Sequence, residues 1–340
     1  MAVTTTSTLS ALTQYIQRKG LAVAEPNIVI GEYGLKNSIP QKNSKTMAFR
    51  RYERIAPVTG KDASTIKSLV EGTVPTDTQP TITTVTLTLS QYGNLFRVSD
   101  QAEWINEVSV DTELMARNSE NMAQTIETVY RDGIMGGTAF GRLTDSIGTI
   151  GAGARTTVAG KINAVALDKV ARVLKGADAK FYTEQIDATN KIGTQAVRKS
   201  YIAVIHPDVE FDLESVPDYV PAANYSSGAG LMKGEVGSYR NIRFVTSTLS
   251  KIFADSGASV AGTKSTTGSL SDVYPALIFG KEAYTVVDLA SAANIFYTPA
   301  SSQDHANPLG QWFSLGWKAM CGSVILNDSW IYRLETVATA

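Results

Sequence analysis

VDTELMARNSENMAQTIETVYRDGIMGG, residues 110–137, carries the strongest structural pattern in this chain of 340 residues. Its apolar side chains recur at spacings of three, four and seven residues, which places them mostly on one stripe of a helix. They are Leu114, Met115, Met122, Ile126, Val129 and Tyr130. Asp111 or Thr112 can cap the start of this helix, and the glycine pair at 136–137 can end it. We therefore predict a helix over about 111–135, a rod of about 36 Å at about 1.5 Å per residue, amphipathic on one face and suited to be the spine of a flat structure.

The strand pattern that precedes this helix is VTLTLSQYG, residues 85–93. Val85, Leu87 and Leu89 alternate with threonine and serine, and successive side chains of a strand point to opposite faces of a sheet. The pattern predicts a strand with one buried face. No catalytic motif surrounds it.

Residues 41–71 form a basic segment with an excess of +4, since seven cationic side chains stand against three acidic ones. These are Lys42, Lys45, Arg50, Arg51, Arg54, Lys61 and Lys67 against Glu53, Asp62 and Glu71. TMAFRRYERI (46–55) is typical of a strand, PVTGKD (57–62) of a turn and STIKSLVEG (64–72) of a returning strand. We predict a long, basic hairpin.

The predicted long helix carries the opposite charge, with five acidic and two basic side chains over 111–132, an excess of −3. A basic hairpin and an acidic helix would suit one another between subunits. We predict such intersubunit contacts for Lys45, Arg50, Arg51, Arg54, Lys61, Lys67, Glu113, Glu120 and Glu127. One exposed ion pair contributes only about 0–1 kcal/mol, but pairs repeated over a closed assembly can set register and orientation.

The remaining patterns predict a mixed α+β fold. The first forty residues are weakly patterned and predict an extended arm. Residues 255–272 are rich in Gly, Ser and Thr, which predicts a mobile surface loop. The other expected elements are an amphipathic helix at 163–175, a strand at Tyr201–Ile205 that turns at Pro207 into a short helix, strand regions at 241–249 and 276–289, and the paired strands Trp317–Ile325 and Trp330–Val337 around an Asn-Asp turn.

Composition argues against several classes of protein. A hydrophobic content of 43%, a charged content of 19% and a net charge of −1 describe an ordinary folded chain without the basic excess of a DNA-binding protein. Cys321 is the single cysteine, so an intrachain disulfide and a thiolate metal cluster are excluded, and a reducing cytoplasm is the expected compartment of synthesis. No apolar run approaches the roughly 20 residues that span a bilayer, so we expect no membrane association.

His206 and Asp208, in the stretch IHPD, are the nearest approach to a catalytic pair. The chain has only two histidines, His206 and His305, and neither has a spacing that places metal ligands on one helix face. A histidine that ends a strand and packs near the turn is the simpler interpretation. The G-x-S-x-G elbow is absent, and the glycine-rich stretches lack the lysine of a P-loop. We predict no catalytic, cofactor-binding or metal-binding residues, and an enzyme using His206 and Asp208 ranks last.

The order of these patterns resembles the major capsid proteins of tailed bacteriophages, and among them the family related to the N4-like phage coat protein. The resemblance is carried by SLVEGTVPTDTQPTITTVTLTLSQYGNLFRVSD followed by ELMARNSENMAQTIETVYRDGIMGGT. Further matching stretches are YIAVIHPDVEFDL, GEVGSYRNIRFVTST, LIFGKEAYTVVDL and NPLGQWFSLGWKAMCGSVILND. Together they cover most of the chain from about residue 40 onward.

The resemblance implies the shell-forming fold of tailed phages, an α+β fold with a long spine helix. It places an N-terminal arm at 1–40, an extended hairpin called the E-loop at 41–75, a P-domain at 76–150 and 292–340, and an A-domain at 151–291. The strand at 85–93 becomes a P-domain strand whose apolar face lies against the spine helix. The basic hairpin becomes an arm laid over a neighbouring subunit.

The function implied by the resemblance is self-assembly into an icosahedral shell around packaged double-stranded DNA. The expected partners are other copies in hexamers and pentamers, with separate scaffolding, portal and decoration proteins, and the DNA is enclosed without sequence-specific binding. The expected location is the virion capsid, assembled in the cytoplasm of the host bacterium. The alternative is an encapsulin-like compartment of similar fold, which would hold a captured protein instead of DNA.

Overall fold

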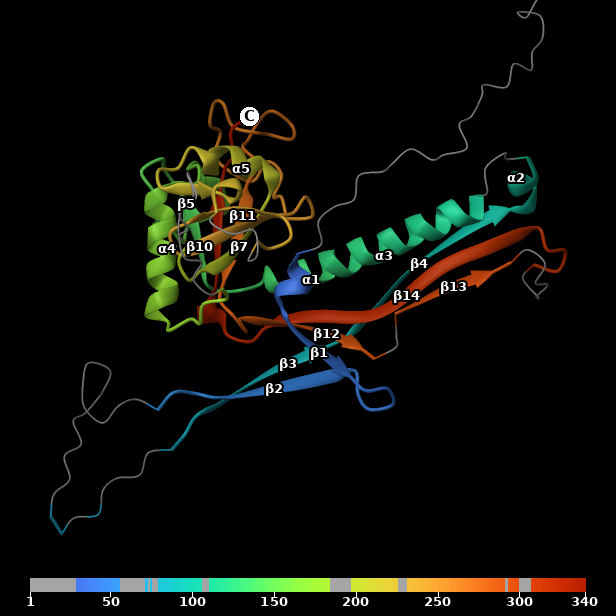
Figure 1. Ribbon diagram of the computed structural model, residues 1–340, viewed down its shortest axis with the longest axis horizontal. Helices are drawn as coiled ribbons and strands as arrows, with labels where there is room; N and C mark the ends of the chain where they lie inside the picture. Colours follow the sequence, from blue (N-terminus) through green and yellow to red (C-terminus); the bar gives the residue numbers. More distant parts are fainter. Residues whose placement is uncertain are drawn as a thin grey trace, which may run out of the picture.

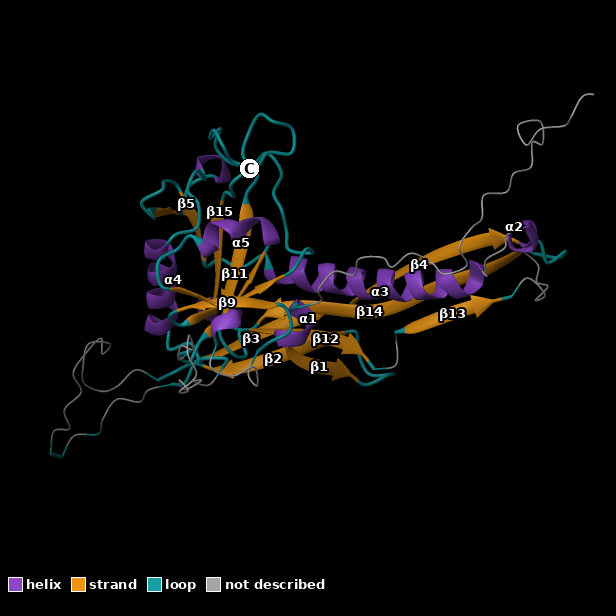
Figure 2. Cartoon of the chain, turned by 45° about the horizontal axis from the view of Figure 1, so that its top comes forward, coloured by secondary structure: helices purple, strands orange, loops and turns teal. Residues whose placement is uncertain are grey.

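The chain forms a globular body, an elongated arm in which a long helix lies over a sheet, and a projecting two-stranded hairpin (Figures 1 and 2). The computed structural model describes residues 29–55, 71–72, 74, 79–105, 110–183, 197–225, 231–290, 293–299 and 307–340. The helices are α1 (Ile30–Tyr33), α2 (Asp100–Ile105), α3 (Val110–Ile134), α4 (Ala164–Gly176) and α5 (Pro207–Glu214). The strands are β1 (Leu35–Ile39), β2 (Thr46–Tyr52), β3 (Ile82–Thr88), β4 (Ser90–Ser99), β5 (Phe140–Leu143), β6 (Ile150–Gly151), β7 (Tyr201–Ile205), β8 (Tyr219–Pro221), β9 (Glu235–Tyr239), β10 (Ile242–Thr246), β11 (Tyr274–Phe279), β12 (Tyr284–Leu289), β13 (Asn294–Thr298), β14 (Trp312–Ile325) and β15 (Ile331–Thr336).

The arm is built from α3 and a five-stranded sheet centred on β14. The predicted long helix is confirmed as α3, which lies along β14 (Figure 1). On one edge β14 pairs with β4, from Trp312↔Ser99 to Cys321↔Ser90. On its other edge it pairs with β12 and β13, and β1 adds in parallel to β12. The result is a single helix over a single sheet, an elongated two-layer arrangement.

The burial of α3 is less one-sided than its apolar pattern predicts. Its most deeply buried described side chains are Asn118, Glu127 and Ile134, with exposed fractions of 0%, 1% and 1%, whereas Met115 is 36% exposed. The rest of the predicted stripe is half-buried. The reason is that one sheet covers the helix from one side, so most of its surface stays near solvent. The side chains of the predicted cap at 111–112 lie outside the described part.

The body is an eight-stranded sheet in the order β6-β5-β15-β11-β7-β10-β9-β8. All five residues of β7 are buried. Tyr201, Ala203 and Ile205 pack in a core with α4 and α5, while Ile202 and Val204 pack on the opposite face with α1 and the end of α3. A continuous apolar run is typical of a strand covered on both faces. The predicted helix at 163–175 is confirmed as α4.

The stretch predicted as one strand at 85–93 belongs to two strands. β3 pairs with β2, from Thr46↔Thr88 to Tyr52↔Ile82, whereas β4 pairs with β14. The hairpin therefore closes with β3 and not with the predicted return at 64–72, whose residues 64–70 lie outside the described part. Leu87 and Leu89 pack in a small cluster with residues of β1, β12 and β14. The prediction that this apolar face lies against the long helix is wrong, because the sheet, and not α3, covers it.

The C-terminal strands β14 and β15 do not pair with each other as predicted. β15 lies in the body between β11 and β5, whereas β14 lies in the arm. The strand region predicted at 276–289 is likewise divided between the sheets, with β11 in the body and β12 in the arm. The chain turns between them at Glu282, whose φ is 62°. The arm sheet therefore takes β12 from before residue 292, and the body sheet takes β5 from before residue 151 and β15 from after residue 292.

Residues 29–39, predicted as part of an extended arm, are packed into the fold. Val29, Ile30, Tyr33 and Ile39 are buried, and β1 pairs with β12 over its full length. The prediction is wrong for this segment, because its apolar side chains complete two cores. Residues 1–28 lie outside the described part.

Residues 255–272, predicted as a mobile surface loop, are joined to one another by hydrogen bonds. The Asp272 carboxylate is nearly buried and accepts hydrogen bonds from the backbone N–H groups of Asp255 and Thr266 at 2.8 and 3.1 Å. Aspartate side chains that bond nearby backbone in this way stabilise turns. The Gly, Ser and Thr content of residues 255–272 could not predict these hydrogen bonds to Asp272.

Candidate subunit interface

The hairpin β2–β3 is rooted on the arm and projects away from it (Figure 1). Met47, Phe49 and Leu87 pack on the small cluster formed with β1 and β12. Along both strands exposed residues alternate with half-buried ones. At the outer end of the pairing, Tyr52 and Ile82 are 72% and 49% exposed. The base of the hairpin is therefore fixed, while its outer part presents apolar and polar side chains to solvent.

Arg51 is held within its own chain. Its guanidinium donates to Glu53 Oε1 at 3.0 and 2.7 Å and to the Leu326 carbonyl at 3.0 Å. The Thr83 hydroxyl donates to the same oxygen of Glu53 at 2.6 Å. Hydrogen bonds from Thr83 and then Arg51 lower the pKa of the Glu53 carboxyl. The group ties β2, β3 and the end of β14 together, so Arg51 fixes the direction of the hairpin.

Arg54 also has a partner in its own chain, Asp178, at 2.9 Å. The two side chains are 72% and 76% exposed. An ion pair this exposed contributes about 0–1 kcal/mol, so it leaves Arg54 available to another partner.

Lys45 and Arg50 are exposed cations of the hairpin. Within the described residues neither side chain takes part in a hydrogen bond or ion pair. Lys61 and Lys67, which the sequence also marks as contact residues, lie outside the described part. The intersubunit role of all four cations stays a prediction.

The three acidic contact residues predicted on α3 differ from one another. Glu120 is bound by Arg117, whose Nη1 lies 2.8 and 2.7 Å from the two carboxylate oxygens. The side chain of Glu113 lies outside the described part. Glu127 is 1% exposed and is bonded inside the chain. A buried carboxylate cannot reach a neighbouring subunit, so the prediction of Glu127 as a contact residue is wrong.

Glu127 instead binds the N-terminal segment of the chain. Its Oε1 accepts the backbone N–H groups of Val29 and Ile30 at 2.7 and 2.5 Å, and its Oε2 accepts that of Gly31 at 2.9 Å. These are N–H groups at the start of α1 that have no partner within the helix. A negative charge there is also favoured by the helix dipole.

We call residues 29–39 the N-terminal clip. The Tyr284 hydroxyl donates to the Ile30 carbonyl at 2.7 Å and the Thr285 hydroxyl donates to the Leu35 carbonyl at 2.7 Å. The clip therefore joins α3, the arm sheet and the core on one face of the body sheet. Sequence reasoning missed it. The one signal of the clip in the sequence is the glycine at position 31. A side chain there would be crowded, because its Cβ would lie 3.3 Å from Glu127 Oε2.

His206 is a capping residue, as the simpler interpretation predicts. Its Nδ1 accepts the backbone N–H of Asp208 at 3.2 Å at the start of α5. The Asp208 carboxylate is held by Lys264 Nζ at 2.6 Å and by the Tyr274 hydroxyl at 2.9 Å. Burial lowers the pKa of the His206 imidazole. His305 lies outside the described part.

The described part of the chain contains no group of three or more His, Cys, Asp or Glu side chains that could hold a metal ion. Of the helices described, none is long and apolar enough to cross a membrane.

The helix over a sheet, the α/β body and the projecting hairpin together define the shell-forming fold of phage capsids. The structure is similar to the capsid of the cyanophage P-SCSP1u, with a TM-score of 0.61 and 14% identity over 99% of this chain and 96% of that chain. It is similar to the capsid of Ralstonia phage GP4, with a TM-score of 0.60 and 12% identity over 100% and 99%. For the Helicobacter pylori bacteriophage KHP30 the values are 0.62 and 9% over 99% and 98%. Identities this low show the fold alone.

A family model described as phage capsid protein matches residues 82–312, and the chain belongs to this family. A search of curated proteins gives no match. As a phage capsid protein, it is a structural component of the virion and not an enzyme. The family model describes a phage capsid protein and so favours the capsid over the alternative of an encapsulin-like compartment.

Proposed function

We propose that the copies associate as hexamers and pentamers in which the hairpin of each copy lies over its neighbour. The observation that carries this proposal is the shape of the hairpin, which is rooted on the arm and projects beyond it (Figure 1). Lys45, directly before β2, and Arg50 on β2 are exposed and unpaired within the described residues, and Tyr52 adds exposed apolar area. A neighbouring copy that covers this strand removes apolar surface from water and pairs the two cations.

The acidic side of this contact is Glu113 and Glu120 of the neighbouring α3. The proposal keeps Lys45, Arg50, Arg54, Lys61 and Lys67 as the basic side and leaves out Arg51 and Glu127, whose partners lie in their own chain. Each pair would be weak alone. Many copies of the same contact in a closed shell add up, and the sign of the charges selects one orientation of neighbours.

The division into functional parts is proposed as follows. The body corresponds to the A-domain predicted at 151–291, and the arm to the P-domain predicted at 76–150 and 292–340. The hairpin corresponds to the E-loop predicted at 41–75. The strand pairing supports extending the E-loop to the end of β3 and supports assigning β15 to the body and β12 to the arm. The N-terminal arm predicted at 1–40 is kept for the residues that precede the clip.

Charge reversal on β2 tests the hairpin contact. In a Lys45→Glu/Arg50→Glu variant, we expect the yield of closed shells to fall at least about tenfold, because like charges facing each other across an interface are unfavourable. Combining it with Glu120→Lys should recover part of the yield. Lys281→Glu, an exposed reversal between β11 and β12, is the matched control. Particles are counted by sedimentation and electron microscopy. Wild-type yield in the double variant would contradict the hairpin contact and leave the family membership untouched.

We further propose that assembly takes place in the bacterial cytoplasm and uses separate scaffolding, portal and decoration proteins. The DNA is held by confinement, which the net charge of −1 supports, since strong phosphate binding needs a basic excess. The stretches quoted above support a kinship with the N4-like coat proteins. Co-purification from infected cells would identify these partners, and particles that assemble in infected cells without any of them would contradict their role.

A further inference from the structure

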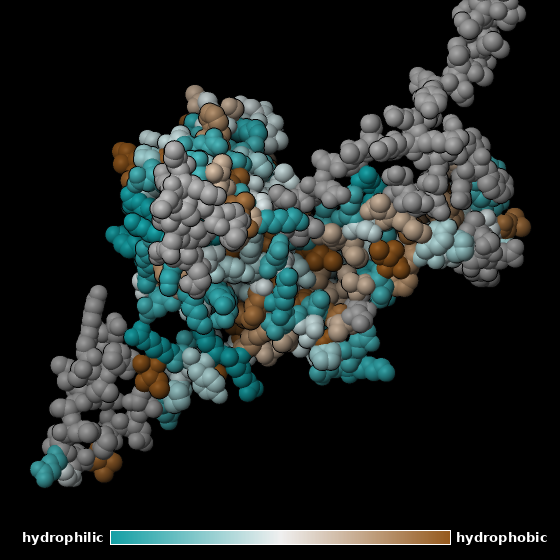
Figure 3. Space-filling model, viewed as in Figure 1, coloured by the Kyte–Doolittle hydropathy of each residue, from teal (hydrophilic) through white to brown (hydrophobic). Residues whose placement is uncertain are grey.

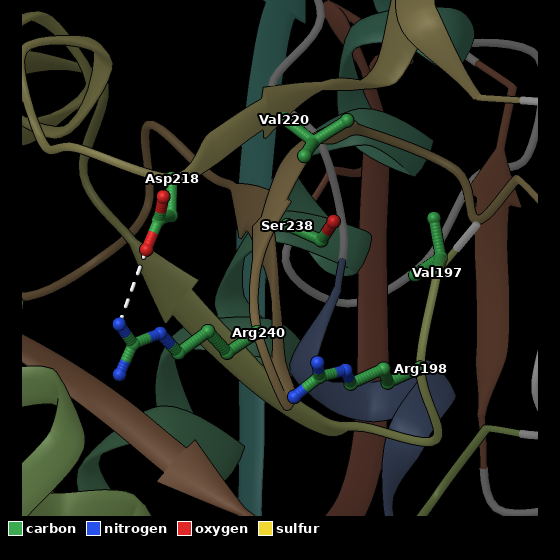
Figure 4. Close-up of a pocket in the computed structure, with 6 residues that line it drawn as sticks. All are labelled: Val197, Arg198, Asp218, Val220, Ser238 and Arg240. Atoms are coloured by element: carbon green, nitrogen blue, oxygen red, sulfur yellow. Dashed lines mark hydrogen bonds and ion pairs between the residues drawn. The ribbon is translucent and has the colours of Figure 1, made fainter. Parts of the chain in front are cut away.

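A basic groove lies between α4 and the turn that joins β9 to β10. It consists of two neighbouring pockets of about 450 and about 360 Å³, which share Arg198 and Arg240 in their walls. Figure 4 shows the first pocket, with the side chains of Arg198 and Arg240 on one side of it. The second pocket is also lined by Arg172 and Lys175 of α4. We call these four cationic residues the basic groove.

Only part of this positive charge is compensated within the chain. Arg240 donates to Asp168 at 2.6 Å and to Asp218 at 3.1 Å, the second contact being the dashed line in Figure 4. Within the described part, the guanidinium groups of Arg172 and Arg198 have no hydrogen-bond or ion-pair partner. Guanidinium groups are geometrically suited to carboxylates. Asp168 and Asp218 also line the pockets, so the four cations leave the groove an excess of positive charge that an anion can pair with.

A second, independent observation lies in the wall of the same groove. Tyr239 is 1% exposed, and its hydroxyl is buried without a hydrogen-bond partner. Buried polar groups in folded proteins are nearly always paired. Tyr239 lies within electrostatic reach of Asp168 and Arg240, and its hydroxyl is a donor that an entering carboxylate can accept from.

The same chain carries an acidic surface without a partner. Glu210 and Glu214 lie four residues apart on α5, and neither takes part in a hydrogen bond or ion pair within the described residues. Like charges at this spacing repel, and burial followed by the charge of Glu214 raises the pKa of the Glu210 carboxyl. Phe211 between them is 69% exposed. We call Glu210, Phe211 and Glu214 the acidic knob.

We propose that the acidic knob of a second copy of this chain docks into the basic groove. Figure 1 places α4 along one side of the body and α5 at its top, so the two surfaces face different directions on one copy. The side of the body where α4 lies is mainly hydrophilic with isolated apolar residues (Figure 3). Val173 of α4 is 46% exposed and can receive the phenylalanine. The contact is separate from that of the hairpin and rests on the self-assembly proposed above.

A side chain fits this site better than DNA does. The groove is recessed between a helix and a turn, which a carboxylate on a flexible side chain can enter, and the chain as a whole has a net charge of −1. DNA binding at this groove would need its phosphates to reach the same recess. It remains one of the outcomes that the experiment distinguishes.

A charge exchange tests the contact. One variant carries Arg172→Glu and Arg198→Glu, a second carries Glu210→Arg and Glu214→Arg, and a third carries all four changes. We expect each double variant to reduce closed shells at least about tenfold and the fourfold variant to restore them to within about twofold. The control is Lys281→Glu. Circular dichroism of the unassembled chains should show unchanged melting, and the milder pair Arg172→Gln and Arg198→Gln serves if a reversal variant fails to fold.

Three results would overturn the inference. Normal shell yield in both double variants would show that the surfaces do not meet, and failure of the fourfold variant to recover would show that they do not meet each other. Normal shells that retain less DNA after reversal of the groove would assign it to DNA. In each case wild-type and control shells still form. Loss of hexamers and pentamers in the wild type itself would instead contradict the proposed function.

Discussion

Replacing Glu127 by glutamine should release the N-terminal clip while leaving α3 folded. Glutamine keeps the size of the side chain but removes its charge, and it turns an N–H donor toward one of the three backbone donors at 29–31. A hydrogen bond to a charged group contributes about 1.5–3 kcal/mol, against about 0.5–1.5 kcal/mol for a neutral one. Over three bonds the expected loss is about 3 kcal/mol.

Two assays on the unassembled chain measure this loss. Urea unfolding gives the change in the free energy of unfolding, and hydrogen exchange reports the amides at 29–31 directly. Since 1.36 kcal/mol corresponds to a factor of ten, protection of these amides should fall by about a hundredfold. Glu120→Gln on the same helix is the control, because its carboxylate is bound only by Arg117 at the surface, and it should change stability by no more than about 0.5 kcal/mol. Equal effects of the two substitutions would refute the reasoning.

Other consequences concern close packing, acid and thiol chemistry. At Gly133 a Cβ would lie 2.7 Å from a backbone carbonyl of β14, so Gly133→Ala should destabilise the chain by about 1–3 kcal/mol in thermal denaturation, whereas Gly136→Ala, with open space around it, should not. For Glu335, burial alone would raise the pKa, but hydrogen bonds and charges from its arginine partners outweigh burial and lower it below 4.5. The stability it contributes is therefore present above pH 4.5 and lost as pH falls through the folded-state pKa, and Glu335→Gln should flatten this part of a pH series of urea unfolding. Burial, and then the charge of Asp288, raises the pKa of Cys321 to about 11; a thiol reagent should label it at least about a hundredfold more slowly in the folded than in the unfolded chain, and rapid labelling would contradict its position in β14.

The sequence predicted those helices and strands that depend on interactions between residues close together in the chain. The periodicity of 110–137 was sufficient for α3, because a helix is closed by bonds between residues four apart. The apolar run at 201–205 was sufficient for β7, and its end at Pro207 for the start of α5. His206 could be placed at the end of a strand because it lies between this apolar run and Pro207.

Strand pairing could not be predicted in this way. β2 pairs with β3, which begins thirty residues after β2 ends. The composition of residues 64–72 is equally typical of a strand, so it could not show that this segment is not the partner of β2. The run at 276–289 looks continuous, yet the turn before β12 sends its two halves into different sheets. Such pairings depend on which apolar faces the rest of the fold leaves uncovered, and a pattern of period two carries no information about that.

The error about Glu127 has a similar origin. Counting charges along α3 treats every carboxylate as exposed, and Glu127 follows directly on the apolar position Ile126, so it can equally point inward. What decides its place is the set of three N–H donors supplied by the clip, about a hundred residues away in sequence. The partners of a buried charge are recognisable only once the chain has brought them together.

The central claim is that copies of this chain associate with one another to build a closed shell. Cryo-electron microscopy of the purified protein, with its mass measured in solution, tests this most directly. The account predicts closed shells or sheets of hexamers in which β2 of one copy lies against the arm of the next. A chain that stays monomeric with scaffolding protein and crowding agents present would contradict it.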